Sequence, residues 1–457
     1  MIPLTLWKIA NIIHGKIMGT TVNNSDYIHS ILTDTRQYAS CALFFALKGH
    51  HYDGHQFITE SIINNGVKAV VVSRFVTIPF PQIIVDDTIV ALGKLAAWIR
   101  KQVTKTKILA LTGSCGKTTV KEMLHVILSQ CGHTLSTFNN MNNKIGVSLT
   151  LLKLNNKYDF AVIELGANQP DEISYTVKLT NPEVVLINNI ELSHIEYFRS
   201  LTGVAKCKGE IFTGLKSNGI AIIHNENNYY NFWKKMLTTK LVWKFSLHKK
   251  PTSNFFSSNI IINYLRTYFT IHTPIGVFDV DMSLLGMHNI CNAIAATALA
   301  TAVEVPLTKI KQGLSMVQAF PGRMYPLFLD KEKNKLLLDD SYNANVASMN
   351  AAACTLANMP GYLVMVVGDM AELGIHSIKY HQIVGSTIRR LAKINKVISI
   401  GIFSKNISSF HSNGEHFHDP EKLSKRLKIL IKTYKKITIL IKGSRNPILD
   451  YLIQTLK

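Results

Sequence analysis

The chain has 457 residues, 47% of them hydrophobic, and its formal net charge at pH 7 is +21. Its length and apolar content are ample for packed cores in about three domains of roughly 150 residues each. The basic residues are scattered, and no block of five or six like charges indicates a charged binding tail. No basic stripe with interleaved aromatic residues favours a nucleic-acid-binding role either.

The chain also lacks the usual marks of a secreted or membrane protein. Its six cysteines form no C-x-x-C pair, which predicts reduced and mostly buried thiols. The N-terminal segment has no basic start and carries Lys8 inside its apolar run, so it is a poor signal peptide. The uncharged run 284–303 contains His288, Asn289 and Asn292, and predicts a buried helix rather than a membrane span. We therefore expect a cytoplasmic protein with no membrane insertion.

In chain order, the first unit ends at the proline-bearing segment "TIPFPQ", and from residue 107 short apolar runs alternate with segments of helical spacing. Strands are expected at 107–113, 160–166, 183–188 and 219–225. Helices are expected at 117–131, 170–180 and 201–215. Alternation of this kind predicts a parallel sheet flanked by helices.

The pattern changes at 260–285, where alternating residues around the turn "TPIG" predict antiparallel strands on the edge of this sheet. Helices are expected next at 289–303 and 306–317. A second alternating series, typical of a small doubly wound domain, follows "FPGRMYP". Its strands are expected at 335–341, 362–369, 396–401 and 436–444, with helices beginning at 347, 377, 420 and 446.

These patterns predict an α/β protein of three domains. A smaller α/β domain is expected at 1–82, and a Rossmann-like domain at 318–457. The central domain, 83–317, is expected to have a mostly parallel sheet of the P-loop type with helices on both faces.

The segment "TGSCGKTT" combines an apolar strand, a glycine loop and a helical pattern. Its two glycines are only three positions apart, closer than in the usual phosphate-binding G-x-x-x-x-G-K-[ST] loop. A tight strand-to-helix turn would also explain it. The context nevertheless favours a phosphate cradle, with Lys117 reaching the outer phosphates and the Thr118 hydroxyl holding Mg²⁺. The expected ATP contacts are Gly113, Ser114, Cys115, Gly116, Lys117, Thr118 and Thr119.

Glu164 ends the apolar strand in "VIELGAN". A charge at a buried strand end is costly unless it is paired or bound to metal. A structural salt bridge is one reading, and ligation of Mg²⁺ through a carboxylate oxygen is the reading that we favour.

Taken together, several segments give the chain a resemblance to the Mur ligases, the ATP-dependent amide-forming enzymes of peptidoglycan synthesis. Their order and spacing are specific, although each alone is not. The segments are "TDTR", "LFFALKG", "TGSCGKTT", "NNKIGV", "VIELGAN", "GVAKCKGEIF", "GMHNICNAIAA", "FPGRMYP", "DDSYNANVASM", "VMVVGDMAELG" and "LIKGSRN".

The resemblance implies that ATP and Mg²⁺ are used to join D-alanyl-D-alanine to a UDP-N-acetylmuramoyl tripeptide through an acyl phosphate. It further implies that the N-terminal domain binds the uridine nucleotide, the central domain binds ATP and the C-terminal domain binds the incoming dipeptide. We expect a monomer with no nucleic-acid partner. A Mur-type ligase for another amino acid, a nucleic-acid-binding ATPase and a non-catalytic scaffold remain as alternatives.

The resemblance also implies roles for single residues. His194 and Lys208 match residues that serve a second Mg²⁺, the lysine after carbamylation, and Lys206 is the competing candidate. With Lys117, His194 and Lys208 form the expected catalytic set. Asn292 matches a nucleotide contact, Arg323 a hinge arginine that neutralises phosphate, and Asp340 a ribose or hinge contact.

The remaining candidates are expected to contact substrates. For the uridine nucleotide they are Thr33, Asp34, Thr35, Arg36 and Lys48. Asn142 and Asn143 match asparagines on the substrate side, and Asn343 and Asn345 lie in a segment expected over the nucleotide. Lys442, Ser444 and Arg445 are candidates for binding the dipeptide or the departing phosphate. The chain departs from the family pattern at Asn139, Ser148, Tyr197 and Arg199.

Overall fold

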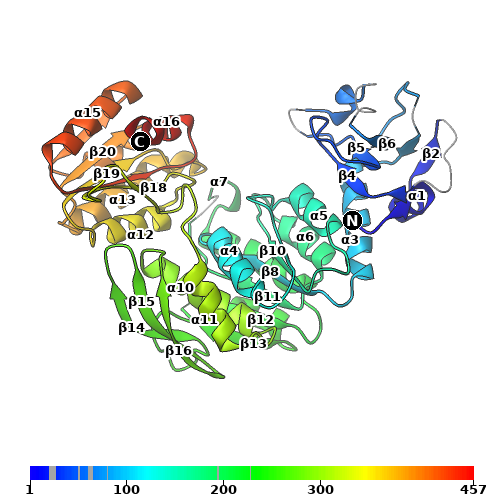
Figure 1. Ribbon diagram of the computed structural model, residues 1–457, viewed down its shortest axis with the longest axis horizontal. Coiled ribbons are helices and arrows are strands. Elements are labelled where there is room, and N and C mark those ends of the chain that lie inside the picture. Colours follow the sequence, from blue (N-terminus) through cyan, green and yellow to red (C-terminus); the bar gives the residue numbers. More distant parts are fainter. Residues whose placement is uncertain (20–26, 50–51, 60–64, 80, 193–194, 227) are drawn as a thin grey trace.

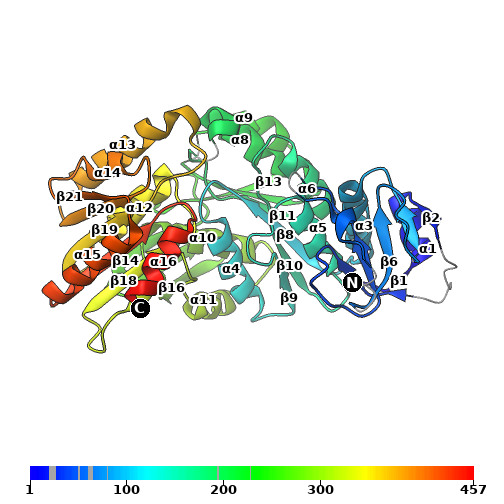
Figure 2. The same cartoon turned by 90° about the horizontal axis from the view of Figure 1, so that it is seen from above.

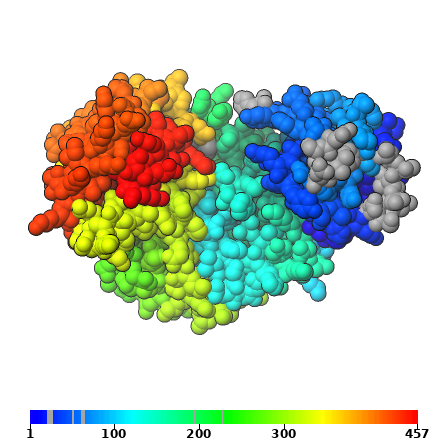
Figure 3. Space-filling model, turned by 45° about the horizontal axis from the view of Figure 1, so that its top comes forward, coloured from blue at the N-terminus to red at the C-terminus, as the bar shows by residue number. Residues whose placement is uncertain are grey.

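The computed structural model describes residues 1–19, 27–49, 52–59, 65–79, 81–192, 195–226 and 228–457. Three units follow one another along an arc, with the N-terminal unit at one end and the C-terminal unit at the other (Figure 1). The view from above shows the same order, and the space-filling view shows the red and blue lobes on either side of the central surface (Figures 2 and 3). The three-domain α/β fold is therefore confirmed, whereas the exact limits at 82/83 and 317/318 stay predictions.

The N-terminal unit contains a five-stranded sheet in the order β2-β7-β6-β5-β4. The strands are β2 (Lys16–Met18), β4 (Ser30–Leu32), β5 (Ala42–Phe45), β6 (Val67–Val72) and β7 (Gln82–Ile84). A short pair, β1 (Leu4–Thr5) with β3 (Tyr27–Ile28), lies beside α1 (Leu6–Ile13), and a 3₁₀ turn spans Gly54–Phe57. Helix α3 (Thr88–Gln102) packs against both α1 and α5 of the central unit, so it joins the first two units.

The central unit is built on a six-stranded, wholly parallel sheet in the order β13-β12-β11-β8-β10-β9. Its strands are β8 (Lys107–Thr112), β9 (Thr134–Ser136), β10 (Phe160–Glu164), β11 (Val184–Ile187), β12 (Ile220–His224) and β13 (Leu241–Phe245). Continuous apolar runs form these strands because helices cover both faces of a parallel sheet. The flanking helices are α4 (Lys117–Leu128), α5 (Lys144–Leu152), α6 (Glu172–Thr180), α7 (Ile195–Phe198), α8 (Leu201–Gly209), α9 (Tyr230–Trp233), α10 (Met287–Thr301) and α11 (Leu307–Met316).

Three details of this unit differ from expectation. The antiparallel strands β14 (Phe256–Ile262), β15 (Thr267–Thr273) and β16 (Gly276–Met282) form a sheet of their own and do not extend the edge of the parallel sheet. The helix expected to start at Pro170 starts at Glu172, because Asp171 takes the left-handed conformation at its N-cap. The helix expected to reach 215 ends at Gly209 and tightens into a 3₁₀ turn, Glu210–Gly214.

The C-terminal unit has a six-stranded sheet in the order β17-β18-β22-β19-β20-β21, in which β17 alone is antiparallel. The strands are β17 (Tyr325–Phe328), β18 (Lys335–Asp340), β19 (Tyr362–Val367), β20 (Lys396–Ile400), β21 (Gly414–Phe417) and β22 (Ile437–Lys442). Its helices are α12 (Val346–Leu356), α13 (Ser377–Arg390), α14 (Lys405–Ser408), α15 (Pro420–Thr433) and α16 (Pro447–Leu456). In a doubly wound sheet of this kind, ligands bind at the carboxyl ends of the strands.

The uncharged run 284–303 forms the buried helix α10, as expected. Over the described ranges, no helix combines the length and apolar character needed to cross a membrane. All six cysteines are free thiols, as expected, but the prediction that most are buried is wrong: only Cys207 is buried, three are half-buried, and Cys131 and Cys354 are exposed.

Candidate functional site

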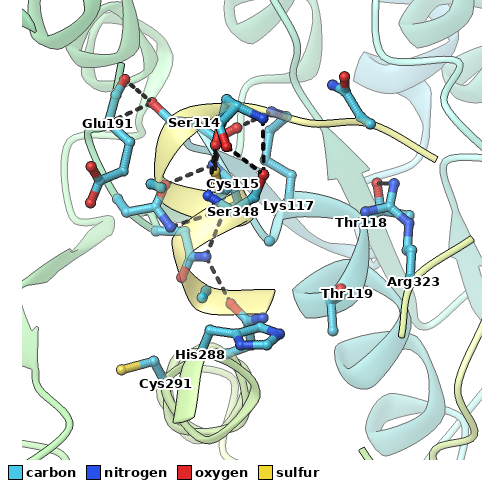
Figure 4. Close-up of a pocket in the computed structure, with 18 of the residues that line it drawn as sticks. Ser114, Cys115, Lys117, Thr118, Thr119, Glu191, His288, Cys291, Arg323 and Ser348 are labelled. Carbon is cyan, nitrogen blue, oxygen red and sulfur yellow. Dashed lines mark hydrogen bonds between the residues drawn. The ribbon is translucent and has the colours of Figure 1, made fainter. Parts of the chain in front are cut away.

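A cavity of about 790 Å³ lies between the central and C-terminal units. It is lined by the loop after β8, the end of β10, the start of α10, the segment that follows β18 and the last residue of β22. The close-up shows the loop residues Ser114, Cys115 and Lys117 facing Ser348 of α12, with Arg323 next to Thr118 (Figure 4). Residues expected at the phosphate site from two separate units therefore line one cavity.

The glycine loop has the backbone that a phosphate cradle requires. Gly116 precedes the first turn of α4 with a φ of 76°, in the left-handed region that glycine adopts without strain. A Cβ on Gly116 would lie 2.5 Å from Asn292 Oδ1, so the loop passes directly over α10. Asn188 Nδ2 donates to Asn292 Oδ1 at 3.0 Å, which ties β11, α10 and the loop together.

We expect Gly116→Ala to weaken ATP binding at least about tenfold. The methyl group would strain the backbone and collide with Asn292, so the loop N–H groups would lose their alignment with the phosphates. Isothermal titration with ATP would measure the change. Gly49→Ala is the control, because a methyl group added at Gly49, in the N-terminal unit, would come no closer than 3.7 Å to the Tyr52 carbonyl oxygen. Normal ATP affinity in Gly116→Ala would contradict the assignment of this loop.

Lys117 lies in the cavity with its ammonium group turned onto the loop. Its Nζ donates to the Gly113 carbonyl at 2.8 Å and to the Ser114 carbonyl at 3.4 Å. Burial lowers the pKa of Lys117, with the carboxylate of Glu164 acting in the opposite direction. The ammonium group is therefore held over the glycine loop by two carbonyls of that loop.

Thr118 and Arg323 join the two units across the cavity. Arg323 Nη2 donates to the Thr118 hydroxyl at 3.0 Å, as the dashed line in Figure 4 marks. The guanidinium group also stacks 4.3 Å from the ring centre of Tyr342. This position beside the expected metal-binding hydroxyl fits the phosphate-neutralising role expected of Arg323, which stays a prediction.

Glu164 has the features of a metal ligand. The residue is 1% exposed and ends β10, and its Oε1 accepts from Asn142 Nδ2 at 2.7 Å. Its Oε2 is buried and has no hydrogen-bond partner among the described residues. Since an orphan buried carboxylate oxygen is costly and Mg²⁺ prefers oxygen ligands, Glu164 fits the role expected of it. In the described part of the chain no group of three His, Cys, Asp or Glu residues gathers as a metal site.

Lys208 is 1% exposed on α8 and lines the same cavity, whereas Lys206 points to solvent. Burial, followed by the positive charge of Lys117, lowers the pKa of Lys208 to about 8. A substantial fraction of the amine is therefore neutral near pH 8, as attack on carbon dioxide requires. Burial in the cavity favours Lys208 over Lys206 as the lysine expected to be carbamylated, and the carbamylation itself stays a prediction. His194, the other expected ligand of the second cation, lies outside the described residues.

One wall of the cavity comes from the C-terminal unit. We call it the Lys442 wall, and it consists of Asp340, Asn343, Asn345 and Lys442. Lys442 Nζ pairs with Asp340 Oδ2 at 2.7 Å and donates to the Asn343 carbonyl at 3.0 Å. Asn345 caps α12 and donates through Nδ2 to Cys115 Sγ at 3.0 Å, so it contacts the glycine loop directly. These side chains face the nucleotide loop, and they line the cavity as expected.

Other candidates lie elsewhere. Asn143 caps α5 by accepting from Gly146 N–H at 2.9 Å and does not line the larger cavity, and its substrate role stays a prediction. Ser444 and Arg445 line a second cavity of about 290 Å³ at the carboxyl ends of β19, β20 and β22.

The expected uridine-nucleotide residues are all in the N-terminal unit, away from both cavities. Arg36 pairs with Asp34 at 2.7 Å, and this hydrogen-bonded pair lowers the pKa of Asp34 to about 2. Thr33 precedes that pair and Thr35 lies between its two members. The backbones of Lys48 and Asp53 form an isolated antiparallel β-bridge. These contacts do not test whether the five residues bind the uridine nucleotide, so that role stays a prediction.

The structure adds residues that sequence reasoning missed. Asn188 and Asn189 both donate to the Cys115 carbonyl, at 3.0 and 3.1 Å, and Asn189 also accepts from the Cys115 N–H. The sequence signal that could have identified them is their position as two successive asparagines at the carboxyl end of a predicted buried strand. Of the departures from the family pattern, Asn139 has a φ of 47°, a conformation that asparagine tolerates in place of glycine.

Three family models match the chain. They are described as Mur ligase family, catalytic domain (residues 27–98), Mur ligase middle domain (111–300) and Mur ligase, glutamate ligase domain (322–445). Among the similar relatives is the UDP-N-acetylmuramoyl-tripeptide–D-alanyl-D-alanine ligase of Escherichia coli, 48% identical over 100% of this chain and 99% of the relative. The enzyme of the same name from Bacillus subtilis is 32% identical, covering 100% and 99%.

Solved structures agree in fold. The crystal structure of MurF from Acinetobacter baumannii has a TM-score of 0.92 and 34% identity, covering 99% of this chain and 98% of that one. MurF from Thermotoga maritima in complex with ADP has a TM-score of 0.81 at 24% identity, covering 93% and 96%, which supports the fold alone. The full-length likeness and the shared three-unit architecture establish that the chain belongs to the Mur ligase family.

Proposed function

We propose that this protein is an ATP-dependent ligase that joins D-alanyl-D-alanine to UDP-N-acetylmuramoyl tripeptide in peptidoglycan precursor synthesis. The observation that carries the proposal is the single cavity in which the glycine loop, Glu164, Lys208 and the Lys442 wall face one another. The full-length relatives that carry this enzyme name support the choice of substrates. We place the reaction in the cytoplasm and assign it to a monomer.

The first chemical step is transfer of the γ-phosphoryl group of ATP to the carboxylate of the tripeptide, which leaves ADP and an acyl phosphate. Little protein nucleophile chemistry is needed, so the residues act by positioning and by neutralising charge. Lys117 turns from the Gly113 carbonyl to the outer phosphates, and Arg323 approaches from the hinge side. Bound Mg²⁺ would be held by Thr118 and Glu164, and it would supply further neutralisation of phosphate charge.

In the second step, the amine of the dipeptide attacks the acyl carbon. The tetrahedral intermediate then expels phosphate, and the nitrogen loses a proton, which gives the amide. Closure of the C-terminal unit on the cavity would exclude water from the acyl phosphate, which would otherwise be hydrolysed. The Lys442 ammonium at the cavity wall is placed to receive the departing phosphate.

The dipeptide fits the second cavity, at the carboxyl ends of β19, β20 and β22. Met370, Phe403 and Leu449 give it an apolar lining suited to the two methyl groups, and Arg445 lies at the same site to meet the terminal carboxylate. The Ser444 hydroxyl accepts from the Ala371 N–H at 2.8 Å and so joins the two loops that form this cavity.

Arg445→Ala is expected to raise the KM for D-alanyl-D-alanine about tenfold or more while leaving the KM for ATP within about twofold. Loss of a guanidinium–carboxylate contact weakens dipeptide binding and does not reach the nucleotide loop. Steady-state kinetics with each substrate varied in turn would measure both constants. Arg389→Ala, which removes an exposed arginine from α13, is the control, and equal KM values in the two variants would place the dipeptide elsewhere.

Release of phosphate from ATP tests the function as a whole. We expect release only when Mg²⁺, D-alanyl-D-alanine and the muramoyl tripeptide are all present. Phosphate release that does not depend on the muramoyl substrate but is stimulated by nucleic acid would instead favour a nucleic-acid-dependent ATPase. The net charge of +21 would then serve to bind nucleic acid.

A further inference from the structure

We infer that Lys121 is a positioning residue for the Mg²⁺ site, through which helix α4 fixes the orientation of the Glu164 carboxylate. The inference rests on the proposed ATP-dependent function. Lys121 lies outside the cavity lining, and its side chain is completely buried. Burying an ammonium group is expensive unless its hydrogen bonds are satisfied, so its contacts show what the charge does there.

The Lys121 ammonium is bound to one loop. Its Nζ donates to the Thr137 carbonyl at 2.6 Å and to the Asn139 carbonyl at 3.2 Å, and it pairs with Glu122 Oε1 at 2.8 Å. The two carbonyls belong to the loop that leaves β9 and leads to Asn142. The charge of Lys121 therefore anchors this loop on α4.

The anchored loop holds Glu164 from both sides. Thr137 Oγ1 accepts from the Glu164 N–H at 3.0 Å, which fixes the backbone of the carboxylate residue. Five residues further along the same loop, Asn142 Nδ2 donates to Glu164 Oε1 at 2.7 Å. With Oε1 held in this way, Oε2 is the oxygen left for the metal.

The position of Lys121 on α4 also relates it to Thr118, the other expected metal ligand. Lys121 follows Thr118 by three positions in α4, so the two side chains leave neighbouring parts of one helical turn. Thr118 lines the cavity, whereas Lys121 holds in position the loop that orients Glu164. Lys121 thus fixes the separation between a hydroxyl and a carboxylate that must meet the same cation.

The test compares Mg²⁺-dependent nucleotide binding in Lys121→Met and in the wild-type chain. Calorimetric titration of ADP at a series of Mg²⁺ concentrations reports the half-saturating Mg²⁺ concentration without needing turnover. We expect that concentration to rise 10–100-fold in Lys121→Met, as is typical when a residue that orients a metal ligand is lost. ADP affinity measured without Mg²⁺ should stay within about twofold, because the glycine loop is untouched.

Lys396→Met is the matched control. Lys396 is also a buried lysine, 8% exposed, and its ion pair with Glu415 at 2.6 Å lies on β20 in the C-terminal unit. Its loss should lower the melting temperature and leave the Mg²⁺ dependence unchanged. An equal shift in Mg²⁺ dependence in both lysine variants would overturn the inference, because it would reveal general destabilisation.

Thr137→Val gives a second, nearly isosteric test that leaves the Lys121 charge in place. It removes the hydroxyl that accepts from the Glu164 N–H, and a rise of at least about fivefold in half-saturating Mg²⁺ is expected. A folded Thr137→Val chain with wild-type Mg²⁺ dependence would refute the inference, even if Lys121→Met failed to fold. Failure of the proposed function would look different, since the wild-type chain itself would then lack Mg²⁺-dependent ADP binding.

Discussion

Lys117→Ala should abolish ligation, with a loss of at least about 100-fold in turnover, and leave the fold intact. The lysine is the cation of the glycine loop, and removing one preorganised group that stabilises transition-state charge typically costs 10²–10³ in rate. Its hydrogen bonds go to the carbonyls of Gly113 and Ser114, within its own loop. Other parts of the fold therefore do not depend on this side chain.

Phosphate release in the presence of both substrates measures the loss, and circular dichroism with thermal melting checks the fold. Lys107→Ala is the control, since Lys107 is an exposed lysine at the start of β8, the strand that leads to the same loop. A folded Lys117→Ala chain with near-normal turnover would remove the loop from the phosphate site.

Lys208→Ala should reduce turnover by about 100-fold or more, with partial recovery when a small carboxylate is added. Burial disfavours the ammonium form, and the pKa of about 8 leaves neutral amine available for carbamylation. The carbamate would offer Mg²⁺ the anionic oxygen that a lysine lacks. The neutral fraction rises as the pH rises through 8, so at a fixed concentration of dissolved carbon dioxide the activation of the wild-type chain should be faster at pH 8 than at pH 7.

Lys206→Ala is a close control, because that lysine is exposed on the same helix two residues earlier. It should retain turnover within about twofold of the wild-type chain. Full activity of Lys208→Ala without any additive would exclude that lysine from the site, and an equal loss in both variants would point to damage of α8.

Local sequence pattern was enough to predict many of the residues that line the larger cavity. The run from Ile108 to Thr112 is buried on both faces, and such a run before a glycine loop predicts a parallel strand. Glu164 was recognisable because a carboxylate at the end of a buried strand needs a partner. Both signals are contained within a few residues, so they do not depend on how distant segments meet.

Properties that depend on contacts between units were harder to predict. The contact between Arg323 and Thr118 joins residues 205 positions apart, and sequence spacing carries no measure of that approach. The three antiparallel strands β14 to β16 alternate as edge strands would, but alternation does not say which sheet a strand joins. Asn143 was expected at the substrate, yet a helix cap uses the same side chain, and the sequence pattern is the same for both.

Lys121 illustrates the same limit. A lysine one turn into a helix ordinarily points to solvent, and nothing in "GKTTVKEM" marks it as buried. Its role emerges only when the loop from β9 is seen to fold over α4 and to supply two carbonyls to the ammonium group.

The most direct test of the proposed reaction follows oxygen from substrate to product. The chain would be incubated with Mg²⁺, ATP, D-alanyl-D-alanine and UDP-muramoyl tripeptide carrying ¹⁸O at both oxygens of its reacting carboxylate. Ligation through an acyl phosphate predicts the muramoyl pentapeptide by mass spectrometry, together with one ¹⁸O atom in each phosphate released. Phosphate without the label, or ATP hydrolysis that yields no pentapeptide, would contradict the account.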